Sequence, residues 1–145
     1  MSYGELPGVV AAFRERFPDE PILVEKAAAF SGPEFIIGGI RDPAFGPAIV
    51  VGAGGILTEL YKDVSSRLCP CCREDALRML DELTLSPIFR GYRNLSYDGE
   101  ALADLVTAVS NLLSEGETIL SQMDLNPVVF TDRGWLVLDA KIILC

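Results

Sequence analysis

The chain has 145 residues, of which 50% are hydrophobic and 23% are charged, so it is long and apolar enough to bury the core of one folded domain. Its 21 acidic and 12 basic residues give a net charge of −9, which argues against nucleic acid or an anionic membrane as the main partner. The sequence contains no histidine, so this chain alone cannot complete a Ser-His-Asp triad, a Cys-His dyad or a His-ligated zinc site.

The sequence contains neither a targeting signal nor a membrane span by the usual criteria. The first residues lack the basic start of a signal peptide. The longest uncharged stretch, residues 43–58, is interrupted by prolines and glycines and is too short to cross a bilayer. We therefore expect a soluble, cytoplasmic protein.

The first half of the sequence predicts one helix followed by strands. Residues 6–17 carry Val9, Val10 and Phe13 on one helical face, and Pro18 ends the pattern. The mostly apolar stretch 22–29 predicts a strand that runs into a loop. Further strands are predicted by three later runs, at residues 35–42, 48–53 and 56–68.

The second half predicts two helices and a hairpin. Leucines at helical spacing predict a helix over residues 74–83, and a longer apolar stripe predicts one over 98–113 with Asp98 as its N-cap. Residues 119–130 and 135–144 predict two strands joined by a turn. Consecutive strands with the helices set aside indicate an α+β fold, in which a mostly antiparallel sheet has its helices packed on one side.

The chain contains four cysteines. Cys69, Cys71 and Cys72 lie in a Cys-Pro-Cys-Cys run, and the fourth is Cys145. A soft-metal or redox site is one interpretation. The sequence has no second CxxC and no histidine, so free thiols are the favoured interpretation.

A glycine-rich loop, residues 52–55, follows a predicted strand, which is where phosphate-binding loops occur. It lacks the Gly-Lys-Ser/Thr ending of a Walker loop, and Leu57 stands where the dinucleotide fingerprint needs a third glycine. A tight turn that needs positive φ is the alternative, and the spacing alone favours it.

The predicted hairpin brings polar side chains together if its loop has an even number of residues. Paired residue numbers then sum to 265, so that Asn126 faces Asp139 and Asp124 faces Lys141. Carboxylate and amide oxygens suit Mg²⁺. A three-residue loop with a bulge at Gly134 would instead move Asp139 to the other face. On chemistry alone, an ordinary edge hairpin with an exposed ion pair is the favoured interpretation.

Four segments, in collinear order, resemble motifs of one family. Residues 34–47 resemble its E-L-I-x-G-x-x-x-D-P-x-F-G-P run, 52–59 its G-x-G-G-x-x-x-E, 63–70 its D-V-x-x-R-L-x-P, and 124–127 its D-I-N-P. The family is the ATP-grasp domain of ADP-forming acyl-CoA synthetases, relatives of the succinyl-CoA synthetase β-subunit. The resemblance covers about residues 21–144.

The resemblance implies an ATP- or ADP-binding site with bound Mg²⁺. Glu25, Lys26 and Ala27 resemble the hinge strand whose backbone meets adenine. Glu34 resembles the acidic residue of the family that approaches the nucleotide.

The resemblance also implies the residues for the phosphates. Asn126 and Asp139 resemble the Mg²⁺-binding pair, with Asp124 beside them. Glu59 resembles a glutamate near the site of phosphoryl transfer, and Arg67 a basic residue near the phosphates.

The implied reaction is acyl-CoA + ADP + phosphate ⇌ acid + ATP + CoA. We expect residues 1–20 to form a helix and lead-in, and residues 21–145 to form the C-terminal ATP-grasp subdomain. Expected partners are the nucleotide, CoA-binding domains or a CoA-binding subunit, and the other half of the ATP-grasp fold. The chain could also form a homo-oligomer, and by itself it should not turn over. The alternative is a non-catalytic nucleotide-sensing or interaction module of the same fold, such as one fused to an acetyltransferase.

Overall fold

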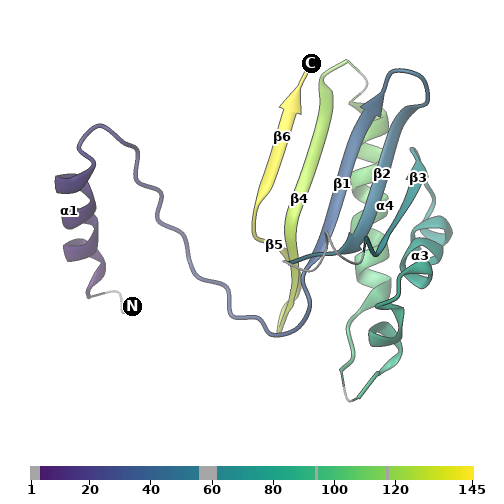
Figure 1. Cartoon of the computed structure of the whole chain (residues 1–145), viewed down its shortest axis with the longest axis horizontal. Helices are drawn as coiled ribbons and strands as arrows, with labels where there is room; N and C mark the ends of the chain where they lie inside the picture. Colours follow the sequence, from purple (N-terminus) through teal and green to yellow (C-terminus); the bar gives the residue numbers. More distant parts are fainter. Residues whose placement is uncertain (1–3, 56–61, 94, 117) are drawn as a thin grey trace.

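The computed structural model describes residues 4–55, 62–93, 95–116 and 118–145 (Figure 1). Within these ranges the chain forms six strands: β1 Phe35–Asp42, β2 Gly46–Ala53, β3 Val64–Leu68, β4 Leu120–Thr131, β5 Gly134–Val137 and β6 Ala140–Leu144. The helices of the same ranges are α1 Leu6–Arg16, α3 Arg73–Glu82, the 3₁₀-helix η1 Ser86–Arg90 and α4 Gly99–Glu115. None of the helices described is long and apolar enough to cross a membrane.

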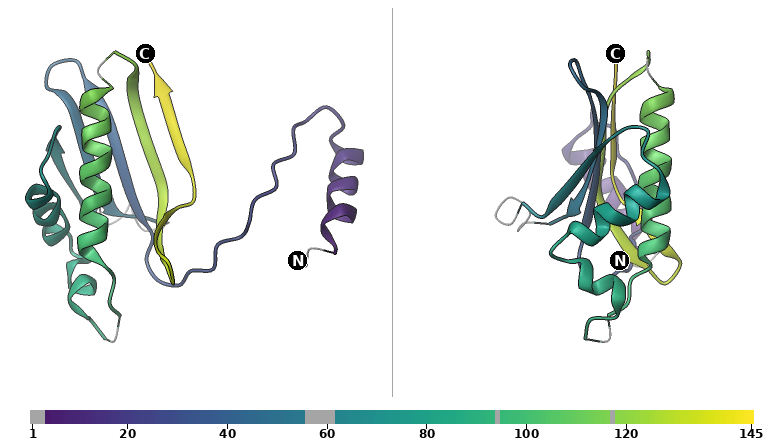
Figure 2. Two further views of the ribbon diagram at one scale, coloured as in Figure 1. Left: turned by 180° about the vertical axis from the view of Figure 1, so that it is seen from behind. Right: turned by 90° about the vertical axis from the view of Figure 1, so that its right-hand side faces the viewer.

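The strands form one sheet in the order β3-β2-β1-β4-β5, and β6 also pairs with β4. The recorded strand pairs of the described residues are all antiparallel. Helices α3 and α4 cover one face of this sheet, and the edge-on view in Figure 2 shows both on the same side. The predicted α+β class, with a mostly antiparallel sheet and helices on one side, is confirmed.

The core lies between the sheet and α4 because alternate strand residues point toward the helix. Phe35 and Ile37 of β1 are fully buried, as are their counterparts on the neighbouring strands and on α4: Val51, Val128, Leu102, Val106 and Leu113. Gly39 allows α4 to approach closely, since a Cβ at this position would lie 2.0 Å from Cδ1 of Leu113. Burial of this apolar surface is the main stabilising contribution to the domain.

The C-terminal hairpin has the register that the even loop predicts. Val128 pairs with Val137, and Asp124 pairs with Lys141, so paired residue numbers sum to 265. The single strand predicted over residues 135–144 is divided into β5 and β6. Backbone bonds still cross the break, because Leu138 N donates to Pro127 O at 2.9 Å and Asn126 N donates to Asp139 O at 3.0 Å.

The strand predicted over residues 22–29 is wrong. This stretch lies in an extended linker between α1 and β1, and it belongs to no strand (Figure 1). Leu23 is 80% exposed, and α1, which was predicted, has no buried residue. A β-strand needs a neighbouring strand to satisfy its backbone groups, and the linker runs away from the sheet.

Candidate functional site

The face of the sheet opposite the helices carries the polar positions of interest. Gly38, Val50, Ser66 and Asp124 occupy one row across β1, β2, β3 and β4. Their strand neighbours Ile37, Val51 and Leu125 point into the core, so this row faces away from α4. We call this surface the open face. It carries a shallow groove of about 410 Å³ whose lining includes Gly38, Ser66 and Asp124.

Asn126 and Asp139 lie next to each other at one end of the open face. The backbone bond between them measures 3.0 Å, and both side chains are exposed. Asp124 lies two residues before Asn126, half-buried, and directly opposite Lys141. The sequence prediction that these residues come together across the hairpin is confirmed as to register.

The donor set of this pair fits Mg²⁺. A carboxamide oxygen and a carboxylate are hard ligands, and their exposure leaves room for waters and phosphate oxygens in the remaining positions. Among the residues that the structure describes, no group of three or more His, Cys, Asp or Glu could hold a metal ion. A cation at Asn126 and Asp139 therefore needs oxygens from a bound phosphate or from water.

The glycine-rich loop packs closely on Glu34, the residue before β1. Gly54 N donates to Glu34 O at 2.6 Å, and a Cβ at Gly54 would lie within 3.1 Å of three Glu34 atoms. Gly55 has a φ of +81°, which favours glycine. The positive φ agrees with the tight-turn interpretation, although the residues after Gly55 lie outside the described ranges, and the half-buried Glu34 lies beside the loop. Glu59 lies outside the described residues.

Arg67 lies on the face of the sheet that the helices cover. Its guanidinium pairs with Glu82 of α3, and its Nη1 donates to Ser65 Oγ at 3.4 Å. The bond to Glu82 raises the pKa of Arg67 and lowers that of the Glu82 carboxyl. The structure therefore does not bring Arg67 together with Asp124 and Asn126, and it gives this side chain a partner on α3.

The residues predicted to meet adenine lie in the linker. Glu25, Lys26 and Ala27 are all exposed, and they are separate from the open face. Their position depends on how the linker leaves the sheet.

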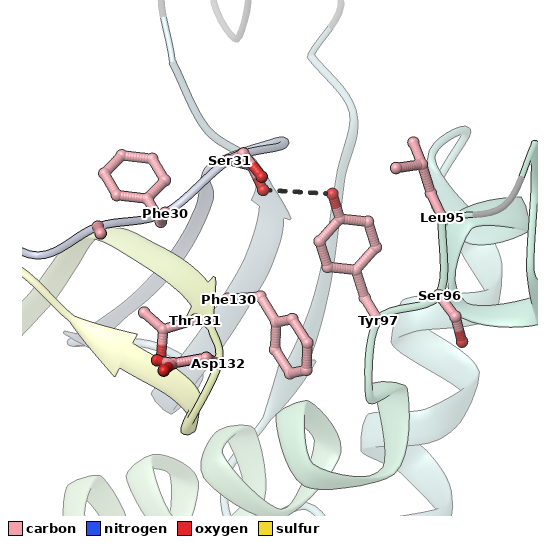
Figure 3. Close-up of a pocket in the computed structure, with 9 residues that line it drawn as sticks. Phe30, Ser31, Leu95, Ser96, Tyr97, Phe130, Thr131 and Asp132 are labelled. Carbon is pink, nitrogen blue, oxygen red and sulfur yellow. Dashed lines mark hydrogen bonds between the residues drawn. The ribbon is translucent and has the colours of Figure 1, made fainter.

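Sequence reasoning missed a cavity of about 550 Å³ at the base of this linker. Its lining includes Phe30, Ser31, Tyr97 and Phe130 (Figure 3). The turn residues Ser31, Gly32 and Pro33 were a signal for a bend there, but their contact with Tyr97 spans 66 positions of sequence.

The four cysteines form no disulfides. Cys71 is buried, and its backbone N donates to Ser110 Oγ at 2.8 Å. Cys72 Sγ lies 3.1 Å from Asp75 Oδ2, and this hydrogen bond raises the pKa of the thiol. Burial raises the pKa of Cys69. Raised pKa values disfavour the thiolate that metal binding and nucleophilic chemistry need.

A known protein family matches almost the whole chain. The profile of a family described as an ATP-grasp domain matches residues 5–144. The chain is 43% identical over 114 residues to the β-subunit of an ADP-forming acetate–CoA ligase I from Pyrococcus furiosus, covering 78% of this chain and 49% of that protein. It is 41% identical over 126 residues to an ADP-forming acetate–CoA ligase I from Archaeoglobus fulgidus, covering 86% of this chain and 18% of that protein. The chain thus spans about half of one relative and a smaller part of the other.

Solved structures of an acetyl-coenzyme A synthetase from Candidatus Korarchaeum cryptofilum have the same fold. The complex with coenzyme A and Mg-AMPPCP superposes with a TM-score of 0.81 at 39% identity, covering 96% of this chain and 64% of that one. A complex with coenzyme A and acetyl-coenzyme A gives a TM-score of 0.83 at 34% identity, covering 99% and 67%.

Proposed function

Because this chain belongs to the ATP-grasp domain family of ADP-forming acyl-CoA synthetases, we propose that it forms the nucleotide- and Mg²⁺-binding portion of such an enzyme. The reaction would be acyl-CoA + ADP + phosphate ⇌ acid + ATP + CoA. The chain spans only part of its relatives, so we propose that the acyl-CoA site and the rest of the nucleotide cleft come from other domains or subunits.

The observation that carries this proposal is the pairing of Asn126 with Asp139. The hairpin register joins the backbones of these two residues by a hydrogen bond of 3.0 Å, and both residues are exposed. We propose that these two side chains hold the cation, with Asp124 beside them. Bound there, Mg²⁺ would supply positive charge to the nucleotide phosphates. The related Korarchaeum enzyme in complex with Mg-AMPPCP supports this reading.

The remaining site residues have positioning and electrostatic roles in this proposal. The backbone of Glu25, Lys26 and Ala27 would contact the adenine base, with Glu34 near the nucleotide. Glu59 would act near the phosphates. Arg67 pairs with Glu82 on the helix-covered face of the sheet, so for Arg67 to act there β3 would have to reorient as well as this bond break. The chain has no histidine. The phosphohistidine segment that occurs in the Korarchaeum enzyme would therefore come from another part of the assembly.

The metal and nucleotide roles can be tested without measuring turnover. Mn²⁺ substitutes for Mg²⁺ and is visible by electron paramagnetic resonance, so Mn²⁺ can be titrated into the 145-residue chain with ADP present. We expect Asp139→Asn to weaken Mn²⁺–ADP binding at least about tenfold, because it removes a negative ligand without changing the shape of the side chain.

The matched control is Asp81→Asn, which neutralises an exposed carboxylate on α3. It should leave the binding constant unchanged. Equal binding by the wild-type chain and Asp139→Asn would locate the cation elsewhere. Failure of the wild-type chain to bind Mn²⁺–ADP would contradict a nucleotide site on this portion, and clear acyl-CoA-dependent ATP synthesis by the pure chain would contradict its dependence on other domains.

A further inference from the structure

The linker between α1 and β1 contacts the sheet domain where Ser31 meets Tyr97 (Figure 3). Gly32, the next residue, lies against the same tyrosine. The Tyr97 hydroxyl donates to Ser31 O at 3.5 Å. Gly32 has a φ of +117°, and a Cβ at this position would lie 2.0 Å from the same hydroxyl oxygen. Glycine is therefore required at position 32 both by its backbone conformation and by the contact. We call this contact the anchor.

Tyr97 gives the anchor a rigid support. It is 7% exposed, and its ring packs against Phe130 at 5.5 Å and against Trp135 at 6.3 Å between centroids. Its backbone N donates to Ile88 O at 3.3 Å, and the next residue, Asp98, accepts a bond from Trp135 Nε1 at 2.6 Å. The hydroxyl therefore has a fixed position relative to the sheet.

The chain before the anchor makes little contact with the sheet domain. Val24 is 51% exposed and Phe30 is 37% exposed, and α1 has no buried side chain. Residues 29–31 also form one wall of the cavity of about 550 Å³, so there is space beside the linker into which it can move. The direction of the linker is therefore set at Ser31 and Gly32.

We propose that Gly32 and Tyr97 are positioning residues that fix the direction in which the linker leaves the sheet and so present residues 25–27 to the nucleotide. Lys26 lies six residues before Gly32, a reach of about 20 Å in extended chain. Over that length, a change of about 15° at the anchor displaces Lys26 by about 5 Å. The presentation of residues 25–27 rests on the proposed function, whereas the anchoring of the linker does not.

The anchor is tested by the distance between two spin labels. Labels at Ala27→Cys and Arg133→Cys, with the exposed thiols removed by Cys72→Ser and Cys145→Ser, report how the linker lies relative to the β4–β5 turn. A chain that carries only the two serine substitutions checks that Cys69 and Cys71 stay unlabelled. We expect Gly32→Ala to shift or broaden the distance distribution by about 5 Å, following the displacement expected at Lys26.

The matched control is Gly46→Ala. Gly46 also has a positive φ, +81°, but nothing lies within 4 Å of a Cβ built there. Gly46→Ala therefore introduces backbone strain without a steric contact. The distance between the two labels should stay as in the chain with Gly46. If Gly32→Ala leaves the distance unchanged, the anchor is overturned. The same holds if both variants change it equally.

A second variant separates the contribution of the Tyr97 hydroxyl from that of the Gly32 backbone conformation. Tyr97→Phe removes the hydroxyl and keeps the ring in its aromatic cluster. Combined with Gly32→Ala, it removes the 2.0 Å contact and leaves the ring carbon Cζ at 2.9 Å. We therefore expect the double variant to return part of the way toward the original distance. A double variant as displaced as Gly32→Ala alone would overturn the role of Tyr97.

Nucleotide binding tests the second half of the proposal. We expect the Kd for ADP to rise about tenfold in Gly32→Ala and to stay unchanged in Gly46→Ala, because a recognition strand that is not pre-organised loses affinity. A displaced linker with unchanged ADP affinity would overturn the presentation of residues 25–27. If the wild-type chain binds no ADP, the presentation role fails together with the proposed function, and the label distances still decide whether the anchor exists.

Discussion

At the scale of single residues, the junction of β3 with α3 shows how charged side chains connect two elements. Glu82 near the end of α3 accepts bonds from Arg67 and Ser65 of β3. Asp63, just before β3, accepts from the backbone N of Thr84 at 2.7 Å and of Leu85 at 3.1 Å. These bonds pair two backbone N–H groups of the turn that follows α3. Residues 63–68, the D-V-x-x-R-L run, therefore connect the edge strand β3 to α3 and to the turn that follows it.

This junction predicts a dependence of stability on acid. The bonds from Arg67 and then Ser65 lower the pKa of the Glu82 carboxyl below its ordinary 4.5. A lowered folded-state pKa stabilises the fold above the unfolded value, and that contribution disappears as the pH falls through the folded value. We expect Glu82→Gln to flatten the fall of Tm below about pH 4.5, measured by circular dichroism. The control is Glu115→Gln, at the exposed end of α4, which should keep the wild-type slope; an equal slope in all three proteins would show that Glu82 does not contribute.

The sequence predicted that Arg67 lies on a strand, but not which face of the sheet its side chain occupies. Strand alternation places Ser65 and Arg67 on the same face. Which face that is depends on the pairing of β3 with β2, where Val51 lies opposite Ser65 and Ile49 opposite Arg67. Since Val51 and Ile49 point into the core, Arg67 turns toward α3. No local signal on β3 shows which face of the sheet Arg67 occupies. The pairing of Asn126 with Asp139 was predictable, because a two-residue turn fixes the register of a hairpin.

At the scale of elements, α4 is fixed at both ends by side chains. Asp98 is its N-cap, as predicted, and accepts from Ala101 N at 2.9 Å. At the other end, the Arg41 guanidinium donates to Leu113 O at 2.6 Å and to Leu120 O at 3.2 Å. One side chain of β1 thus satisfies a carbonyl at the end of α4 and a carbonyl at the start of β4. A cation at this end is also favoured by the helix dipole.

We therefore expect Arg41→Met to destabilise the domain. The substitution keeps much of the apolar stem and removes both bonds, and hydrogen bonds to a charged group contribute about 1.5–3 kcal/mol. Urea denaturation followed by the fluorescence of Trp135 would measure the loss of free energy of unfolding. Arg133→Met, at an exposed position in the β4–β5 turn, is the matched control and should cost about 0.5 kcal/mol or less. Equal losses in the two variants would contradict a special role for Arg41.

Elements with an internal signal could be predicted from the sequence, and elements that depend on distant partners could not. The stripe of leucines and valines predicted α4, and the apolar run predicted β1 with its observed ends. The apolar stretch 22–29 has the composition of a strand but no neighbour in the sheet. The short helix η1 has no periodicity to detect, and its Ile88 is held in the core by tertiary packing.

At the scale of the whole molecule, the described residues leave two surfaces of interest uncovered. One is the open face of the sheet, and the other is the apolar side of α1, where Phe13 is 52% exposed and Phe17 is 43% exposed. Helices shorter than about 12 residues are marginal in water without tertiary packing. We therefore expect α1 to obtain its stability from another surface, which agrees with a chain that spans only part of its relatives.

This arrangement predicts that the sheet domain is stable without the N-terminal region. Removal of residues 1–29 leaves Ser31, Gly32 and their contact with Tyr97 in place, and none of the described residues 4–29 has a side chain buried in the core. We expect the free energy of unfolding of residues 30–145 to lie within about 0.5 kcal/mol of that of the full chain, as for substitutions at exposed sites. The urea m-value should also change little, because it follows the surface that folding buries. A loss of several kcal/mol would mean that α1 or the linker packs on the sheet in solution, since only burial of apolar surface on that scale would account for it.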